Sequence, residues 1–136
     1  ICCLRPGVAG LSETITVRSI IGRFLEHGRI YVFANGGEFL SDKNIVMISS
    51  ADLMPRNLRR RVECFMRLEN PTIRKQVLHQ IMVALLRDEK NAWYLQPDGS
   101  YVHPQTDETS FSCHEYFMSN PSLSGLGSLA ATQDNG

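Results

Sequence analysis

At 136 residues the chain is long enough to bury one hydrophobic core and too short for two, so we expect a single domain. Its 14 lysines and arginines balance its 14 aspartates and glutamates, which argues against a general electrostatic surface for nucleic acid or for an acidic membrane. Any anionic ligand would therefore be held by a local group of cations.

The cysteines give no sign of a metal site or a disulfide framework. They lie at positions 2, 3, 64 and 113 without a C-x-x-C pair, and the start of the chain lacks a secretory signal pattern. No apolar stretch approaches the roughly 20 residues that a membrane span requires. We therefore expect a cytoplasmic protein. Because Ile1 rather than Met begins what reads as a buried strand, we also expect a piece cut from a longer protein.

The first half of the chain predicts a strand, a helix and two further strands. Residues 1–4 read as a short buried strand, and a loop rich in Pro and Gly follows. A helix is predicted over about residues 14–26, ending before Gly28, because apolar side chains recur at helical spacing. These side chains are Val17, Ile20, Ile21, Phe24 and Leu25. Residues 29–34 and 45–49 read as strands that pair antiparallel across a turn signal.

The second half predicts a third strand, the clearest helix and a hairpin. Residues 61–69 alternate apolar and polar side chains, as a strand does. Asn70 as N-cap and Pro71 at the first helical position begin a helix that extends to about Asp88. The apolar segments around Pro97-Asp98-Gly99 form a terminal hairpin.

These elements predict a mixed α/β fold, a sheet flanked by helices, in one domain over residues 1–118. From residue 119 to residue 136 small and polar side chains dominate. We expect this last segment to be a flexible tail.

A histidine and several cations gather around the ends of the two central strands. His27 and Arg29 precede the first strand, and Ser50, Asp52 and Arg56 follow the second. A phosphoryl group requires a titrating imidazole for proton transfer or attack, fixed cations for its oxygens, and short polar side chains for orientation. We interpret the set as a phosphate site, in which the planar guanidinium of Arg56 suits phosphate oxygens.

Each of these residues also has a structural interpretation. His27 fits a structural histidine, Arg29 a solvated edge residue, and Asp52 a capped turn that starts a short helix. The run Arg59-Arg60-Arg61 reads as a solvated face without a catalytic role. The other three histidines match no zinc spacing, and no P-loop motif is present, so neither of those sites is expected.

Several segments together resemble the C-terminal catalytic domain of bacterial polyphosphate kinase, a family that phosphorylates itself on histidine. The segments that carry this resemblance are residues 1–7, 11–13, 24–30, 49–58, 60–63, 93–95 and 98–101. The match departs at Leu53, where family members often have Trp.

The resemblance implies a phospholipase-D-like half, with a motif H-x-K, four residues, D, then G-S-x-N and a later Glu. His27 keeps the histidine, and the other motif positions hold Arg29, Ala34, Ser49-Ser50 and Asp52. Glu63 falls where some such enzymes place the carboxylate that orients the histidine. Replacement of the Lys and the Asp puts phosphodiesterase chemistry in doubt.

What the resemblance implies is reversible transfer of the γ-phosphate of ATP to inorganic polyphosphate, through a phosphohistidine in the preceding domain of the same chain. Mg²⁺ would come with the nucleotide, since no protein-only metal site is seen. His27 would contact the transferring phosphates and protonate or stabilise the leaving group, with Glu63 as the other catalytic residue. The phosphate-binding residues would be His27, Arg29, Ser50, Asp52 and Arg56.

The complete enzyme is expected to be a homo-oligomer that uses ATP, ADP and polyphosphate, and this piece alone is expected to be inactive. Two alternatives stay open. One is a phospholipase-D-like phosphodiesterase half-site, and the other is a non-catalytic domain that binds phosphate.

Overall fold

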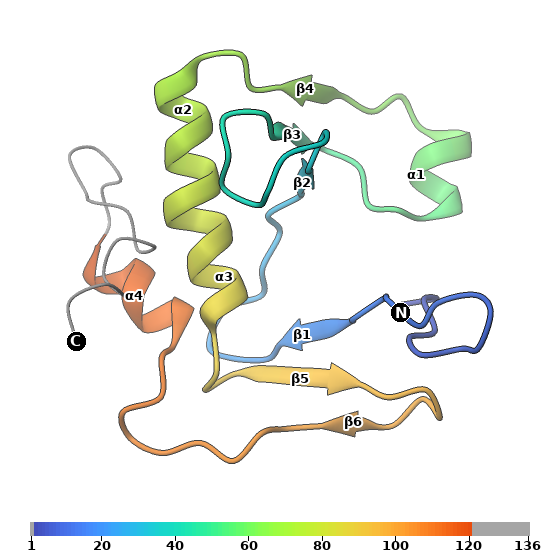
Figure 1. Ribbon diagram of the computed structural model, residues 1–136, viewed down its shortest axis with the longest axis vertical. Coiled ribbons are helices and arrows are strands. Elements are labelled where there is room, and N and C mark those ends of the chain that lie inside the picture. Colours follow the sequence, from blue (N-terminus) through green and yellow to red (C-terminus); the bar gives the residue numbers. More distant parts are fainter. Residues whose placement is uncertain (1, 121–136) are drawn as a thin grey trace. The chain divides into compact units, whose positions relative to one another are not determined.

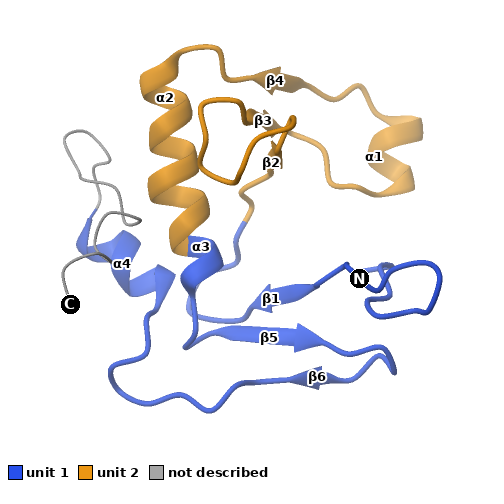
Figure 2. Ribbon diagram, viewed as in Figure 1, with its two compact units in different colours: residues 1–26, 85–121 blue, residues 27–84, 122–136 orange. Residues whose placement is uncertain are grey.

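A computed structural model describes residues 2–120 of the chain (Figure 1). Contacts between residues divide the chain into two compact units (Figure 2). Within the described range, unit 1 holds residues 2–26 and 85–120, and unit 2 holds residues 27–84. Each unit contains one three-stranded sheet and helical residues, so the predicted mixed α/β class is confirmed.

The sheet of unit 2 is built from the predicted central strands. Its order is β2-β3-β4, with β2 over Ile30–Phe33, β3 over Ile45–Ser49 and β4 over Phe65–Arg67. Both pairs are antiparallel, and Ile30 lies opposite Ile48. The predicted pairing of the two central strands is confirmed, and the third strand forms at the centre of its predicted range.

A long helical segment supplies the other half of the core of unit 2. It consists of α2 (Pro71–Gln76), the π-helix η1 (Val77–Met82) and α3 (Val83–Arg87). The Asn70 side chain accepts hydrogen bonds from the backbone N–H groups of Thr72 and Ile73, as its predicted N-cap role requires. The buried core consists of Val46, Leu68 and Leu78.

Helix α1 (Pro55–Arg60) lies between β3 and β4 in the chain. Pro55 occupies its first turn, where a missing backbone N–H costs nothing. The helix has six residues and one buried side chain, that of Asn57. Its placement brings the residues that follow β3 back towards the residues that precede β4.

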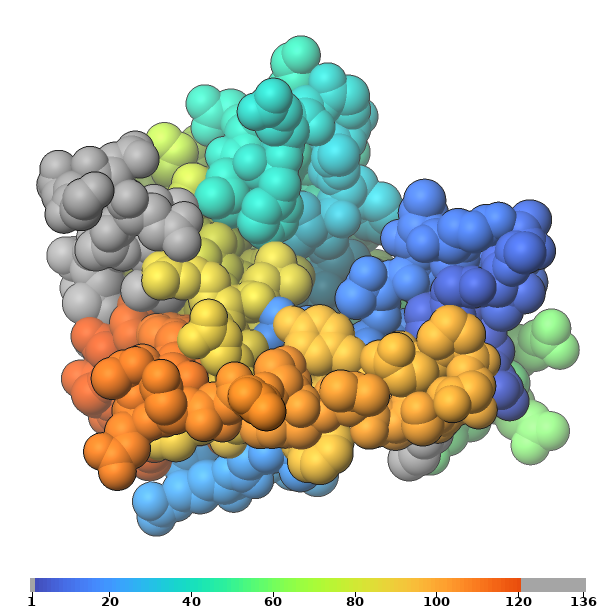
Figure 3. Space-filling view, turned by 60° about the horizontal axis from the view of Figure 1, so that its bottom comes forward, coloured from blue at the N-terminus to red at the C-terminus, as the bar shows by residue number. Residues whose placement is uncertain are grey.

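Unit 1 has a sheet of order β1-β5-β6, with β1 over Arg18–Ile20, β5 over Ala92–Leu95 and β6 over Tyr101–Val102. The β5–β6 hairpin is the predicted one, and Gly99 adopts a positive φ of 88° in its turn. In the space-filling view the hairpin lies along the surface shown (Figure 3), and both residues of β6 are exposed. Helix α4 (Cys113–Ser119) was not expected from the polar composition of this stretch.

Two predicted elements are wrong. Residues 14–26 form no helix but hold the strand β1, and residues 2–4 have no regular structure. The run of β-branched side chains from Thr14 to Val17 favours extended backbone, and the Leu95 N–H donates to the Val17 carbonyl at 2.9 Å. Cys2 to Leu4 are exposed and have no neighbouring strand among the described residues. Of the expected tail over 119–136, residues 121–136 lie outside the described range, and Ser119 belongs to α4.

Candidate phosphate-binding site

His27 lies in an irregular segment, residues 21–29, that leads into β2. The expected helix before it is absent, so it does not join a helix to a strand. Its side chain is exposed, and no interaction of the imidazole is recorded within residues 2–120. Its backbone carbonyl accepts a hydrogen bond from Nη1 of Arg29 at 3.3 Å. The imidazole is therefore free to meet a ligand, while the backbone on its C-terminal side is tied to a neighbouring cation.

Asp52 holds two arginines together. Its Oδ1 accepts from Nε of Arg29 at 2.8 Å, and its Oδ2 lies 3.3 Å from Nη2 of Arg56. The side chain of Arg56 is 62% exposed, whereas that of Arg29 is 27% exposed. Each guanidinium has five N–H groups, so both arginines keep donors for a ligand. The two cations are thus fixed side by side with free donors facing outward from the pair.

Glu63 connects the end of β3 to helix α1 in the same site. Its Oε2 accepts from the hydroxyl of Ser50 at 2.5 Å, and its Oε1 accepts from Nδ2 of Asn57 at 2.7 Å. Ser50 in turn accepts from the backbone N–H of Cys64 at 3.1 Å. Both oxygens of Glu63 are therefore occupied by the end of β3 and by α1. The expected hydrogen bond from Glu63 to His27 is not among the contacts of the described residues.

The backbone around Ala51 connects these groups to the sheet. The hydroxyl of Ser49 donates to the Cys64 carbonyl at 2.9 Å and accepts from the Ala51 N–H at 2.9 Å. The hydroxyl of Tyr31, on β2, donates to the Ala51 carbonyl at 3.1 Å. Ala51 itself is fully buried. The loop that carries Asp52 is consequently held from two strands at once.

The charges of the site stabilise one another. The guanidinium of Arg29, with that of Arg56, holds the pKa of Asp52 below its usual range, and the hydrogen bond to Asp52 raises the pKa of Arg29. Hydrogen bonds from Ser50 and then Asn57 lower the pKa of Glu63. Both carboxylates are therefore ionised at neutral pH, and the site has two anions and two cations before any ligand binds.

All six residues predicted for the site, His27, Arg29, Ser50, Asp52, Arg56 and Glu63, lie in unit 2. Hydrogen bonds link five of them through one network, and His27 joins it by its carbonyl. Asn57 was missed. It is 3% exposed and bonds both Arg56 and Glu63. A buried polar residue in a short helix would have been a signal, but burial is not visible in the sequence.

The arrangement suits an anion better than a cation. No group of three or more His, Cys, Asp or Glu side chains able to hold a metal ion occurs among residues 2–120. The two carboxylates already have their oxygens on protein donors. Among the six predicted site residues, the two arginines and His27 are the ones whose side chains keep N–H donors for a ligand, and such groups recognise phosphate oxygens.

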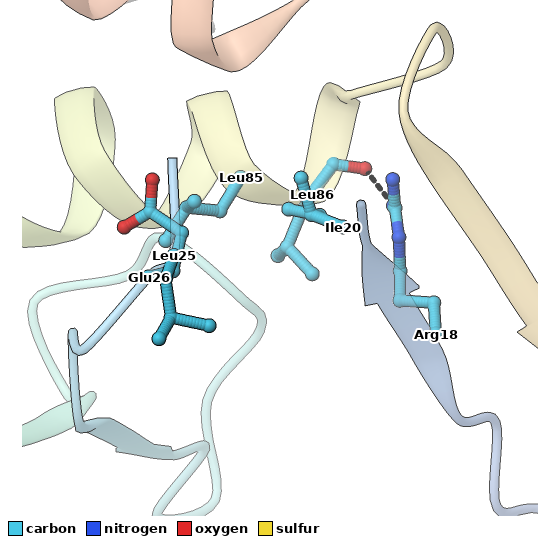
Figure 4. Close-up of a pocket in the computed structure, with 6 residues that line it drawn as sticks. All are labelled: Arg18, Ile20, Leu25, Glu26, Leu85 and Leu86. Carbon is cyan, nitrogen blue, oxygen red and sulfur yellow. Dashed lines mark hydrogen bonds between the residues drawn. The ribbon is translucent and has the colours of Figure 1, made fainter. Parts of the chain in front are cut away.

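Unit 1 contains an open pocket of about 350 Å³ that is lined by Arg18, Ile20, Leu25, Glu26, Leu85 and Leu86 (Figure 4). Its one cation donates to the carbonyls of Leu86 and Asp88, which engages both of its terminal nitrogens. The rest of the lining is mainly aliphatic. This pocket lacks the free cations of the site in unit 2.

Comparison with known proteins gives a consistent result. Residues 1–114 match the family described as polyphosphate kinase C-terminal domain 2. The chain is 58% identical over 127 residues to a polyphosphate kinase of Erythrobacter litoralis, which covers 93% of this chain and 18% of that protein. It is 51% identical over 119 residues to a polyphosphate kinase of Synechocystis, covering 86% of this chain and 16% of the relative.

A solved structure is similar in fold. The crystal structure of polyphosphate kinase from Porphyromonas gingivalis superimposes with a TM-score of 0.74 at 34% identity, over 85% of this chain and 17% of that one. The chain thus spans less than a fifth of the length of these relatives. Among the described residues no helix is both long enough and apolar enough to cross a membrane.

Proposed function

The chain belongs to the polyphosphate kinase C-terminal domain 2 family, and we propose that it supplies half of the active site of a polyphosphate kinase. In this proposal the complete enzyme transfers the γ-phosphoryl group of ATP to inorganic polyphosphate, and the reverse. The observation that carries the proposal is the pair of arginines fixed by one aspartate beside a histidine with a free imidazole.

Arg29 and Arg56 bind the phosphate oxygens. Phosphoryl transfer depends mainly on positioning and on cations placed where negative charge develops. Asp52 was predicted to bind phosphate directly, but a carboxylate repels phosphate, and its two oxygens lie against the arginines. We therefore assign Asp52 the role of spacing the two guanidinium groups. Mg²⁺ enters with the nucleotide and neutralises phosphate charge, since the described carboxylates do not form a resident metal site.

His27 acts on the departing phosphate. In the forward direction a nucleophilic histidine of the preceding domain attacks the γ-phosphorus, and the bond to the bridging oxygen of ADP breaks. His27 donates a hydrogen bond or a proton to that oxygen, and it takes the proton back when the reaction reverses. An imidazole suits both directions because its ordinary pKa lies near neutrality.

Incorporation of labelled γ-phosphate tests the proposal. The complete polypeptide that carries this domain is incubated with labelled ATP, Mg²⁺ and a polyphosphate primer, and labelled polyphosphate separated from ATP by chromatography and labelled protein are both measured. We expect polyphosphate synthesis by the complete polypeptide and none by the 136-residue chain alone, because the nucleophile lies elsewhere. Labelling of the isolated chain would contradict the proposed division of the site.

A phosphodiesterase assay on the complete polypeptide examines the alternative activity. Arg29 stands where phospholipase-D-like enzymes have Lys, and its Nε is committed to Asp52. We expect no hydrolysis of bis(p-nitrophenyl) phosphate. Diester hydrolysis without polyphosphate synthesis would replace the proposed function by that of a phosphodiesterase.

A further inference from the structure

His114 is a buried histidine in unit 1 that the proposed function does not use. It lies in the first turn of α4 and is 3% exposed. A buried polar ring needs partners, because unpaired polar atoms in a protein interior are costly. Within residues 2–120, the imidazole of His114 meets one short segment, residues 22–26.

The imidazole contacts every second residue of that segment. Nδ1 accepts the backbone N–H of Phe24 at 3.5 Å, and the two rings meet edge to face with centroids 5.4 Å apart. Nε2 lies 3.0 Å from Oε1 of Glu26. Within residues 2–120 this nitrogen makes no hydrogen bond, so its contact with Glu26 is one of proximity.

Gly22 shows how closely the ring and the segment approach. A methyl group added at this glycine would lie 2.6 Å from Nδ1 of His114. Gly22 has no positive φ, so its backbone conformation is open to other residues. The imidazole therefore excludes a side chain at this position, and so does Asn91, whose Oδ1 would lie 3.0 Å from the methyl.

The start of helix α4, which carries His114, is held in place by hydrogen bonds. The backbone N–H of Cys113 donates to Oδ2 of Asp88 at 2.7 Å, and Ser112 accepts from Nδ2 of Asn91 at 3.0 Å. Asp88 is 1% exposed. The start of α4 is therefore anchored by buried hydrogen bonds, and a side chain on its first turn has little freedom to move.

The residue that follows this segment is His27. Residues 21–29 form no helix or strand, but backbone hydrogen bonds hold their two ends, from the Ile21 N–H to the Asn91 carbonyl and from the Ser49 N–H to the Arg29 carbonyl. Between these ends, side-chain contacts help to fix the backbone. His114 contacts Glu26, which is peptide-bonded to His27, and Arg29 donates to the His27 carbonyl on the other side. The backbone of His27 is thus held by one contact before it and one contact after it, while its side chain stays free.

We propose that His114 is a positioning residue for His27, acting through the irregular segment Gly22 to Glu26. The inference rests on the proposed catalytic role of His27. Without the His114 ring the irregular segment samples more conformations, and a smaller fraction of the enzyme places His27 against the reacting phosphate. His114 itself touches no substrate.

Steady-state kinetics of the complete polypeptide test this role, with His103→Ala as the matched control. His103 is also a partly buried histidine of unit 1, but it lies against the Lys90 carbonyl and the Trp93 ring. We expect His114→Ala to lower kcat by about tenfold while the KM for ATP stays nearly constant, as a small misplacement of a catalytic group does. His114→Gln, which keeps a polar donor near Glu26, should lose less. His103→Ala should leave kcat unchanged.

A double-substitution cycle separates positioning from general damage to the fold. In a His27→Ala background, His114→Ala should cause no further loss, because the residue through which it acts has been removed. Amide exchange in the 136-residue chain gives a second readout: the Phe24 N–H should exchange faster in His114→Ala and at the original rate in His103→Ala.

If His114→Ala does not fold, Gly22→Ala perturbs the same contact from the other side and should also lower kcat. Unchanged kcat in a folded His114 or Gly22 variant would overturn the inference, and so would an equal loss in the His27→Ala background. Wild-type turnover of His27→Ala alone would instead overturn the proposed function, and the positioning role with it.

Discussion

The two units each contain a carboxylate surrounded by hydrogen-bond donors, and the two carboxylates have different surroundings. Asp88 in unit 1 is 1% exposed and accepts from the backbone N–H groups of Asn91 and Cys113, both at 2.7 Å, and from Nδ2 of Asn91 at 3.0 Å. Asp52 in unit 2 is 35% exposed and faces two arginines.

The two clusters differ in how many N–H groups their donors keep free for a further hydrogen bond. Each backbone N–H around Asp88 has one hydrogen, and it is used, so that cluster can only hold the fold together. The guanidinium groups around Asp52 each have several N–H groups, and part of each is exposed. Lowered carboxyl pKa values occur at both places. Spare donors at the surface, rather than the perturbed pKa, distinguish the candidate phosphate-binding site from the Asp88 cluster.

The largest expected effect concerns the free imidazole beside the Asp52 cluster. In the complete polypeptide His27→Ala should reduce polyphosphate synthesis by about 100-fold or more, the usual loss for an acid–base group. The melting temperature should not change, because the side chain is exposed and has no recorded partner in the described structure. Turnover close to wild type would return His27 to a structural role.

Removing each carboxylate tests the comparison directly. Asp88→Ala removes the acceptor of three hydrogen bonds, among them that of the buried Cys113 N–H, and should destabilise the chain by about 2–3 kcal/mol, measured by urea unfolding. Asp52→Ala should hardly change unfolding but should weaken ATP binding, because the two arginines lose their spacer. Similar unfolding curves for the two variants would remove the distinction between the clusters.

The dependence of stability on pH gives a further test of the Asp88 carboxylate. Burial acts to raise the pKa of Asp88, but hydrogen bonds from Asn91 and Cys113 hold it below the ordinary value of 3.8. The ionised carboxylate therefore stabilises the folded chain above about pH 3.8, and this contribution is lost as the pH falls through the lower folded-state pKa. The stability difference between wild type and Asp88→Asn should shrink in that acid range. A difference that grew on acidification would contradict the assigned direction.

A smaller effect is expected from changing the more exposed arginine. Arg56→Lys keeps the charge but loses the planar fork, so the KM for ATP should rise by about tenfold, the cost of one charge-assisted hydrogen bond. Arg59→Lys is the matched control, since Arg59 lies on the same short helix and has no contact with Asp52. Equal effects of the two substitutions would mean that α1 contributes only general charge.

The smallest effect is expected at Glu63. Glu63→Gln can still accept from Asn57 or Ser50, but it lacks the negative charge and the second acceptor oxygen of the carboxylate, so the KM for ATP should rise by about threefold through a looser α1. The pH profile of kcat should keep its shape, because no contact joins Glu63 to His27 in the described structure. A shifted profile would restore the orienting role that the motif position suggested.

Patterns confined to neighbouring residues predicted much of the fold. The hydrophobic stripe and the Asn70-Pro71 start identified the long helix, and turn residues identified both hairpins. The helix predicted over residues 14–26 was wrong because apolar side chains at helical spacing also fit a short strand. The pairing of β1 with β5, more than seventy residues later, decided between them, since a strand gains its hydrogen bonds from a partner that the local sequence does not show.

For the site, the sequence by itself determined which side chains are present and, through the family resemblance, that they belong together. Only the tertiary structure decided their contacts. It placed Glu63 on Ser50 and Asn57, and it placed His114 on a segment ninety residues earlier in the chain. A hydrogen bond depends on distances of about 3 Å between atoms, and sequence separation carries no information about such distances once the chain has folded back on itself.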